Sequence, residues 1–241
     1  NIGGFNVIGE PTFYNGKFYG MTSAGGAGNN GIIYSYDPVT TALVKLYDVQ
    51  NSGTNTPSGG FTVYNNKLYG ATSSGGTGNY GGIIMYDPVA NAASTVYHLP
   101  VGGLMGINIQ NVMTVYNNKL YGNTKNGGTG SYGVIFEFDP ATNNYTVAYN
   151  YTTVAGTGGY EPTGVLTLNG NKFYTITRYY SDVIVAQFDP ATNAVTQRSV
   201  YTPASSYNTP GYHNALTVVP AFIANGIANN CCAMGCDAVG N

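Results

Sequence analysis

The densest group of side chains capable of chemistry is the run from Arg178 to Asp182, which reads Arg-Tyr-Tyr-Ser-Asp. A cation, two aromatic rings and a carboxylate can form a recognition patch, because the rings stack on sugars or proteins and the charges orient the ligand. The same run can equally be a short loop closed by a local ion pair between Arg178 and Asp182. We therefore treat Arg178, Tyr179, Tyr180 and Asp182 as candidate ligand-binding residues.

Two further tyrosines, Tyr80 and Tyr132, occupy equivalent places in glycine-rich loops, where Asn30 stands in a third such loop. Exposed aromatic residues on repeated loops can stack on sugars or anchor a partner protein. They can also pack against a neighbouring structural unit. Both interpretations remain open, and Tyr80 and Tyr132 join the candidate ligand-binding residues.

The two histidines and three glutamates offer no catalytic arrangement, because each lies alone without a nucleophile, acid–base partner or metal-ligand neighbour at a useful spacing. These residues are His98, His213, Glu10, Glu137 and Glu161. A pair of carboxylates for glycosidase chemistry would have to be assembled by the fold. The sequence therefore predicts no catalytic residue, no metal site and no cofactor.

Asp-Pro pairs and glycine loops recur, and their spacing favours turns over chemistry. Proline pre-sets a turn dihedral and the aspartate accepts main-chain N–H groups. The glycine loops precede strands and lack a following Walker lysine, so a phosphate site is not indicated. The aspartates are Asp37, Asp87, Asp139 and Asp189; the loops are Gly25-Gly-Ala-Gly28, Gly75-Gly-Thr-Gly78 and Gly127-Gly-Thr-Gly130.

These turns belong to a sequence repeat. The lysine of a Lys-Leu/Phe-Tyr motif recurs in steps of 50, 52 and 53 residues, at Lys17, Lys67, Lys119 and Lys172. The Asp-Pro pairs recur in steps of 50, 52 and 50. Periods of about 40 to 50 residues that contain several short strands are typical of propeller blades. We expect the repeated lysine to be a solvated charge at the start or edge of a strand.

The second copy predicts four strands in each unit. Residues 61–64 and 67–72 flank Asn65-Asn66, which suits a type I′ hairpin turn. Residues 82–86 and 94–99 are rich in β-branched and aromatic residues, and form the third and fourth strands. We therefore predict an all-β protein, a β-propeller of four-stranded blades of about 50 residues. A fragment of a larger propeller is the alternative.

Four copies are clear and a fifth fades. They cover about residues 10–49, 57–99, 112–151 and 162–201, with a partial copy at 209–220. The fourth copy lacks the glycine loop and carries Arg178–Asp182 in its place. We expect a repeat domain over residues 1–220, followed at 221–241 by a non-repeat tail or closing segment. Its cysteines, Cys231, Cys232 and Cys236, are disulfide candidates.

The composition constrains the partners. Only 7% of residues are charged, against about 25% in typical domains, and the net charge is −2. No basic stripe is present, so nucleic acid is not an expected partner. The sequence contains no apolar run of about 18 residues, so it predicts no transmembrane helix. Polarity comes instead from Gly, Asn, Thr, Ser and 23 tyrosines, a pattern typical of secreted all-β proteins.

The ordered phrase Asn-Lys-Leu-Tyr-Gly-x-Thr, Gly-Gly-x-Gly-x-Tyr-Gly and Ile-Phe-Glu-Phe-Asp-Pro-Ala-Thr-Asn resembles the GloVer (Gloeo/Verruco-type) repeat. Residues 117–143 carry the best match, and the likeness extends over about residues 10–201. The resemblance implies a bacterial protein, extracellular or on the cell surface, with a propeller-like fold. It implies no activity and supplies no catalytic residues.

The leading functional hypothesis is a secreted, non-enzymatic binding or surface-structural module, such as an adhesin or a filament component. Its partner would be a surface glycan, a protein or further copies of the chain. The alternative is a secreted polysaccharide hydrolase or lyase with its site at the propeller mouth. That alternative requires convergent carboxylates, or a histidine with a partner, on one face.

Overall fold

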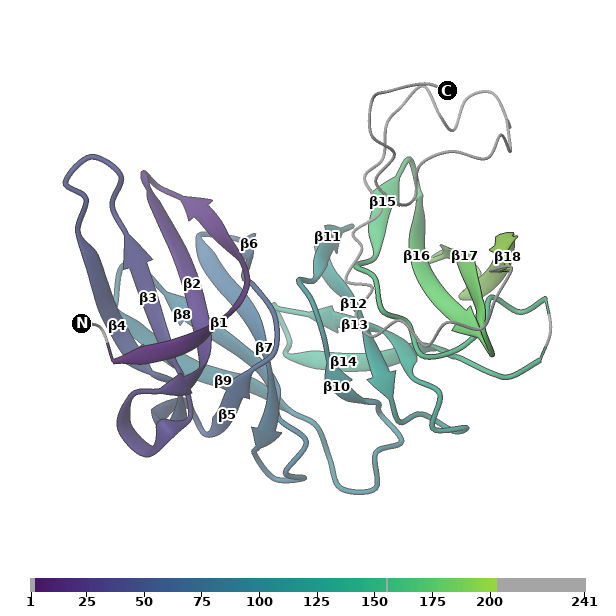
Figure 1. The fold of residues 1–241 in the computed structure, drawn as a ribbon, viewed down its shortest axis with the longest axis horizontal. Coiled ribbons are helices and arrows are strands. Elements are labelled where there is room, and N and C mark those ends of the chain that lie inside the picture. The colour runs from purple at the N-terminus through teal and green to yellow at the C-terminus, as the bar shows by residue number, and fades with distance from the viewer. Residues whose placement is uncertain (1–2, 155, 203–241) are drawn as a thin grey trace.

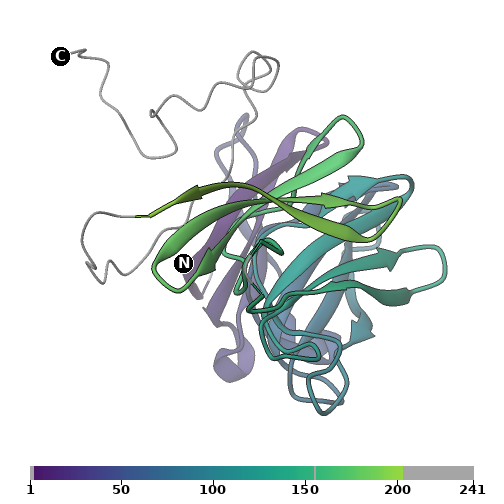
Figure 2. The same ribbon diagram turned by 90° about the vertical axis from the view of Figure 1, so that its right-hand side faces the viewer.

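The computed structural model describes residues 3–154 and 156–202, which form four antiparallel sheets. We call the sheets blades 1 to 4 in chain order. Figure 1 shows them side by side, from purple blade 1 to green blade 4. In Figure 2, blade 4 faces the viewer and the other blades lie behind it. The partial fifth copy, His213 and the three cysteines lie outside the described residues.

Each blade runs up and down from its first strand to its fourth. Blade 1 contains β1 (Gly4–Tyr14), β2 (Lys17–Gly25), β3 (Ile32–Tyr36) and β4 (Leu43–Asp48). Blade 2 contains β5 (Thr54–Pro57), β6 (Thr62–Tyr64), β7 (Lys67–Gly75), β8 (Gly82–Asp87) and β9 (Ala92–His98). Two short 3-10 helices, η1 (Ala27–Asn29) and η2 (Val49–Ser52), lie in connections.

Blade 3 contains β10 (Ile107–Ile109), β11 (Thr114–Tyr116), β12 (Lys119–Asn126), β13 (Val134–Asp139) and β14 (Asn144–Asn150). Blade 4 contains β15 (Thr167–Asn169), β16 (Lys172–Tyr179), β17 (Asp182–Asp189) and β18 (Ala194–Tyr201). The predicted four-stranded unit is therefore correct. Its first strand, however, is interrupted in blades 2 and 3, where β5 and β10 pair with the far ends of β7 and β12.

Segments expected to be linkers thus contain strands. In blade 1 the two halves form one strand, and β1 begins at Gly4 with a register shift between Ile8 and Thr12. The linker sequences do not alternate between apolar and polar residues, and Thr56 and Asn108 have positive φ. Only pairing with the long second strand makes these segments extended, so local propensity misses them.

The predicted turns form as the residue types require. Asn65 and Asn66 both have positive φ, as do Asn117 and Asn118, which is the type I′ pattern. Each Asp-Pro aspartate accepts a main-chain N–H two residues ahead, as Asp87 does from Val89 at 2.9 Å. The third and fourth strands also share a bulge at the same position in every blade.

The core lies between blades rather than within them, because consecutive sheets bury their facing surfaces against one another. Alternate residues of the second strand point to opposite faces. We call the face bearing Leu68 in blade 2 the leading face, and the face bearing Tyr69 the trailing face. Leu68 packs with Tyr19 and Met21 on the trailing face of blade 1, and Tyr69 packs with the leading face of blade 3.

In blades 1 to 3, a threonine two residues before the end of the first strand joins one blade to the next. Its hydroxyl donates to the carbonyl of the residue just before the equivalent threonine in the following blade. The pairs are Thr12 with Phe61, Thr62 with Met113 and Thr114 with Leu166. The repeat therefore encodes the joint between blades as well as the blade.

Candidate functional site

The hairpin between β16 and β17 differs from its counterparts in the other blades. Tyr179 pairs with Asp182, so only Tyr180 and Ser181 connect the strands. Tyr180 is 72% exposed and has a φ of 53°. Left-handed backbone is uncommon for a bulky side chain, since Asn and Gly adopt it at lower cost. This strained, exposed tyrosine marks the corner of blade 4 as a candidate site.

Arg178 is held beside the hairpin by the segment that precedes β15. Its main chain forms a two-bond bridge with Tyr160 (2.7 and 2.9 Å). Its guanidinium lies 2.6 Å from the carboxylate of Glu161 and 5.6 Å from the centre of the Tyr160 ring. About half of the Arg178 side chain is exposed. A cation stacked on an aromatic ring and fixed by a carboxylate still offers N–H donors to a ligand.

The local ion pair considered for Arg178 and Asp182 does not form. Cross-strand partners share a face of a sheet, and Arg178 is opposite Val183 whereas Asp182 is opposite Tyr179. The two charges therefore leave the sheet on opposite sides. Within residues 3–154 and 156–202, Arg178 pairs with Glu161 and Asp182 is in no ion pair.

Four tyrosine rings form a continuous series across the junction of blades 3 and 4. The ring centroids of Tyr132 and Tyr160 are 5.5 Å apart, those of Tyr160 and Tyr179 6.2 Å, and those of Tyr179 and Tyr180 4.8 Å. The main-chain N–H of Tyr180 donates to the Tyr160 hydroxyl at 3.0 Å. We call Tyr132, Tyr160, Tyr179 and Tyr180 the tyrosine ladder.

The two equivalent loop tyrosines have different surroundings. Tyr132 belongs to the ladder and also packs against the core between blades 3 and 4. Tyr80 packs against the core between blades 2 and 3 and has no part in the ladder. Tyr160 and Glu161 were not singled out as ligand-binding residues from the sequence. The one sequence feature that sets them apart is a large aromatic residue followed by a charged residue, at the end of a linker that is otherwise rich in glycine.

The glycine loops bind their own chain. In the first loop the N–H of Gly25 donates to Asn29, that of Gly26 to the carbonyl of Gly3, and that of Ala27 to the Asp48 carboxylate. Because these N–H groups already have acceptors, they do not converge on an anion. The hydrogen bonds of this first loop agree with the turn role predicted for it.

A side chain at the end of the fourth strand holds the first and the third glycine loops by a hydrogen bond. Asp48 accepts from Ala27, and Asn150 accepts from Thr129, both at 2.8 Å. His98 stands at the equivalent position in blade 2. Its buried Nδ1 atom has no hydrogen-bond partner among the described residues. His98 therefore shares the position of Asp48 and Asn150 without their hydrogen bond, and it lies on blade 2, away from the ladder.

The repeated lysines are ion-paired, which corrects the expectation of solvated charges. Lys67 pairs with Asp87 and Lys172 with Asp189, whereas Lys17 lies 3.9 Å from Asp37. These contacts form because the second and third strands bring the first residue of one beside the last residue of the other. Blade 3 differs, since Lys119 pairs with Glu137 instead of its Asp-Pro aspartate.

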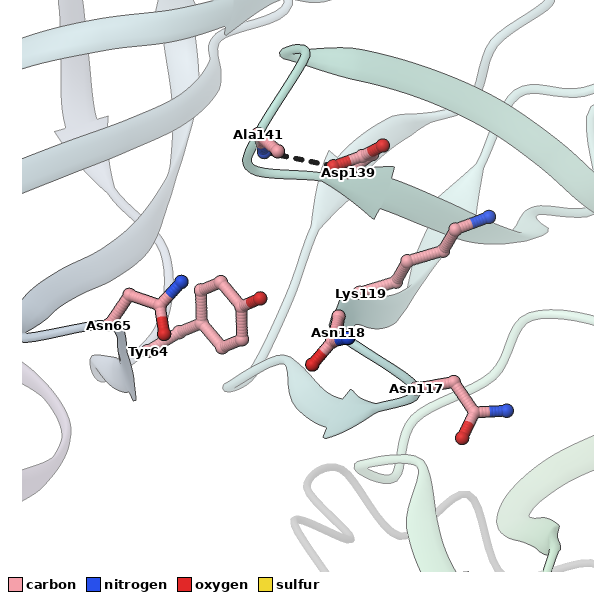
Figure 3. A pocket seen from close by; sticks show the side chains of 7 residues that line it. All are labelled: Tyr64, Asn65, Asn117, Asn118, Lys119, Asp139 and Ala141. Carbon is pink, nitrogen blue, oxygen red and sulfur yellow. Dashed lines mark hydrogen bonds between the residues drawn. The ribbon is translucent and has the colours of Figure 1, made fainter.

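A hollow of about 440 Å³ lies between the turns of blades 2 and 3 (Figure 3). The Tyr64 ring projects into it from blade 2, while Asp139 is held by the N–H of Ala141 at its far side. The lining residues are Tyr64, Asn65, Asn117, Asn118, Lys119, Asp139 and Ala141. These turns lie at the opposite end of the strands from the glycine loops and the ladder.

No group of three or more His, Cys, Asp or Glu side chains suited to a metal ion occurs in the described part of the chain. Glu137 lies in an ion pair of blade 3, Glu161 in that of blade 4, and Glu10 lies on β1 of blade 1. Over the same residues, no helix has the length and apolar character needed to cross a bilayer.

Comparison with known families decides the relationship that the repeat indicated. The family model of the Gloeobacter/Verrucomicrobia repeat matches residues 3–184. The chain belongs to this repeat family. No curated protein matches it.

Solved structures of low sequence identity share the fold. TolB from Acinetobacter baumannii is 14% identical with a TM-score of 0.53, and the match covers 80% of this chain and 43% of that one. A putative TolB from Agrobacterium tumefaciens is 12% identical with a TM-score of 0.51, covering 78% and 62%. This chain therefore spans less than two thirds of either. The likeness supports a propeller-like all-β repeat fold.

Proposed function

We propose that this chain is a secreted, non-enzymatic binding module that recognises a surface glycan or protein through the tyrosine ladder and Arg178. The observation that carries the proposal is Tyr180, a largely exposed aromatic residue held at positive φ. Such strain, of the order of 1 kcal/mol or more, is most easily understood at a position where the ring has a function. An extracellular setting agrees with the low charge and with the family resemblance.

The ladder has the features expected of a binding surface. Tyr132, Tyr160 and Tyr179 are half-buried, and Tyr180 at the end of the series is exposed. Arg178 supplies hydrogen-bond donors, and Glu161 fixes its position. Tyrosine has few rotatable bonds and loses little conformational entropy on binding. Tyrosine and arginine are also enriched among the few contact residues that carry most of the binding affinity.

Glycan-array and whole-cell binding assays test this proposal with three variants. Tyr180→Asn removes the ring while keeping a residue that favours the local backbone, and Arg178→Ala removes the cation. We expect each to weaken binding at least tenfold. Tyr201→Ala is the matched control, because Tyr201 is 53% exposed on β18. Binding that persists in both ladder variants, or an unmodified chain that binds no surface polymer, contradicts the proposal.

A surface-structural role is the second candidate, and it rests on blade 1. Among the described residues, no blade covers the leading face of this blade, and Phe5, Val7, Phe13 and Leu43 are each at least 50% exposed. In the other blades the preceding trailing face covers this face. We propose that a further blade covers it, either within a closed ring of four blades and a partial fifth, or in a larger ring or assembly.

Sedimentation velocity separates these possibilities. If copies associate through the open face, the unmodified chain sediments as dimers or longer species, and Phe5→Ser with Phe13→Ser returns it to a monomer. A monomer at all concentrations argues against the structural role and leaves ring closure within one chain. The rival hydrolase or lyase needs convergent carboxylates, or a histidine with a partner, on one face. The three glutamates stand on three different blades, and the buried Nδ1 of His98 has no hydrogen-bond partner among the described residues.

A further inference from the structure

The turn ends of the blades meet at three junctions, and two of these are closed. At the first, the Tyr14 hydroxyl donates to Asn66 Oδ1 at 3.2 Å. At the third, the Tyr116 ring packs edge-on against Phe173, with centroids 5.6 Å apart. The tyrosine at the second junction is Tyr64, which instead lines the hollow between blades 2 and 3.

Glu137 accounts for part of this difference. Ser35, Met85 and Gln187 occupy its position in the other blades. Its carboxylate draws Lys119 away from Asp139 and accepts the Tyr121 hydroxyl at 2.6 Å. Burial raises the pKa of Tyr121, and Glu137 raises it further, so the phenol remains a donor. Asp139 keeps its main-chain turn bonds but has no lysine ion pair.

The lining therefore combines an aromatic wall, a carboxylate and three primary amides. Asn65, Asn117 and Asn118 all have positive φ, and their turns fix the amide positions before any ligand arrives. Lys119 and Glu137 balance one another, which leaves the single negative charge of Asp139 to face the hollow. Anionic ligands are disfavoured there, and one carboxylate is too few for a metal ion.

We propose that this hollow between blades 2 and 3 binds a neutral saccharide. Adjacent sugar hydroxyls donate to Asp139 and to amide oxygens, and accept from the amide NH₂ groups. The apolar C–H face of the sugar ring stacks on Tyr64. A volume of about 440 Å³ lies within the usual range for small-molecule sites and accommodates one or two sugar units.

Asn118→Gly tests the amide without disturbing the turn, because blade 1 has Gly16 at the equivalent position with φ of 80°. Asn66→Gly is the matched control in the neighbouring turn. Isothermal titration calorimetry with neutral mono- and disaccharides should show binding to the unmodified chain. We expect affinity to fall about tenfold in Asn118→Gly and to stay within twofold in Asn66→Gly.

Glu137→Met tests the cause of the opening. Blade 2 has Met85 at this position and retains its lysine–aspartate pair. Released from Glu137, Lys119 should pair with Asp139, and saccharide affinity should fall at least tenfold. Tyr180→Asn should leave this affinity unchanged, which separates the hollow from the ladder. The proposal is overturned if no neutral saccharide binds, if acidic saccharides bind more tightly, or if Asn118→Gly and Asn66→Gly behave alike.

Discussion

Blades 1 to 3 and blade 4 connect their second and third strands in different ways. The first three use a glycine loop whose N–H groups bind the chain itself, as Gly26 and Ala27 do. Blade 4 uses a two-residue hairpin that exposes Tyr180. The glycine loop fixes the backbone and exposes few reactive side chains. The hairpin of blade 4 has a strained backbone and exposes an aromatic ring. Under the proposed function, the glycine loops serve the stability of the fold and the blade 4 hairpin serves binding.

The largest effect should come from the glycine loop. Gly81 has φ of 75°, and a Cβ there would lie 2.0 Å from the Thr72 carbonyl oxygen. We expect Gly81→Ala to lower the free energy of unfolding by about 3 kcal/mol. Gly170→Ala, at φ of 62° with no atom within 4 Å of the new Cβ, should cost only about 1 kcal/mol. Equal losses in urea unfolding would show that the loop is not close-packed.

Acid should act on all four blades, because the Asp-Pro turn is common to them. Lys67 and the N–H of Ala90 lower the pKa of Asp87, and the N–H of Ala141 lowers that of Asp139. Each of these aspartates has a lower pKa in the folded chain than in the unfolded chain. Its charge therefore stabilises the fold above about pH 4, and this stabilisation is lost as the pH falls through the folded-state pKa. We expect Tm to drop below about pH 4.

Replacing one aspartate by asparagine should test this acid effect. Asp37 and Asp189 also have lowered pKa values, so Asp87→Asn should reduce the acid-dependent fall in Tm without abolishing it. A Tm that is constant from pH 6 to the acid limit would contradict the assignment of these carboxylates as charged turn formers.

The residues that hold the first and third glycine loops offer a smaller effect. Asn150 accepts the N–H of Thr129, and Val200 stands at the equivalent position in blade 4, where no such loop exists. We expect Asn150→Leu to cost about 1 kcal/mol and Val200→Leu to cost almost nothing. Hydrogen exchange of the Thr129 amide should quicken in the first variant. Unchanged exchange would mean that Asn150 does not hold the loop.

The smallest effect should have the opposite sign. Tyr180→Asn relieves an unfavourable left-handed tyrosine and should raise the free energy of unfolding by about 0.5 kcal/mol or slightly more. The same variant is expected to lose ladder-dependent binding. Thermal unfolding beside the binding assay gives both values. A variant that is less stable than the unmodified chain would show that the ring supports the fold rather than a ligand.

The turns were predictable because each depends on residues close in sequence. Asn65-Asn66 and the Asp-Pro pairs specify their dihedrals or their hydrogen bonds locally. The strands β5 and β10 were missed because their extended form depends on β7 and β12. The repeated bulge between the third and fourth strands has no local signal either. Pairing between strands determines the extended form of β5 and β10 and the position of the bulge, which the local sequence does not indicate.

The candidate site was only partly predictable for a similar reason. Arg178, Tyr179 and Tyr180 interrupt the repeat and could be found from the sequence. The partners of Arg178 come from the segment before β15, and the ladder includes Tyr132 from blade 3. The predicted alternative pair with Asp182 failed because hairpin register places the two charges on opposite faces. Such register depends on the two-residue turn, which sequence spacing alone does not fix.

The threonine joints between blades have a direction. The hydroxyl always belongs to the earlier blade and the carbonyl to the later one, as in Thr12 with Phe61. Blades 2 and 3 therefore each carry both halves of the same connector, the donor hydroxyl and the acceptor carbonyl. Duplication or loss of a segment of about 50 residues would change blade number without requiring a new interface. A gene encoding such a chain can lengthen or shorten its product one module at a time.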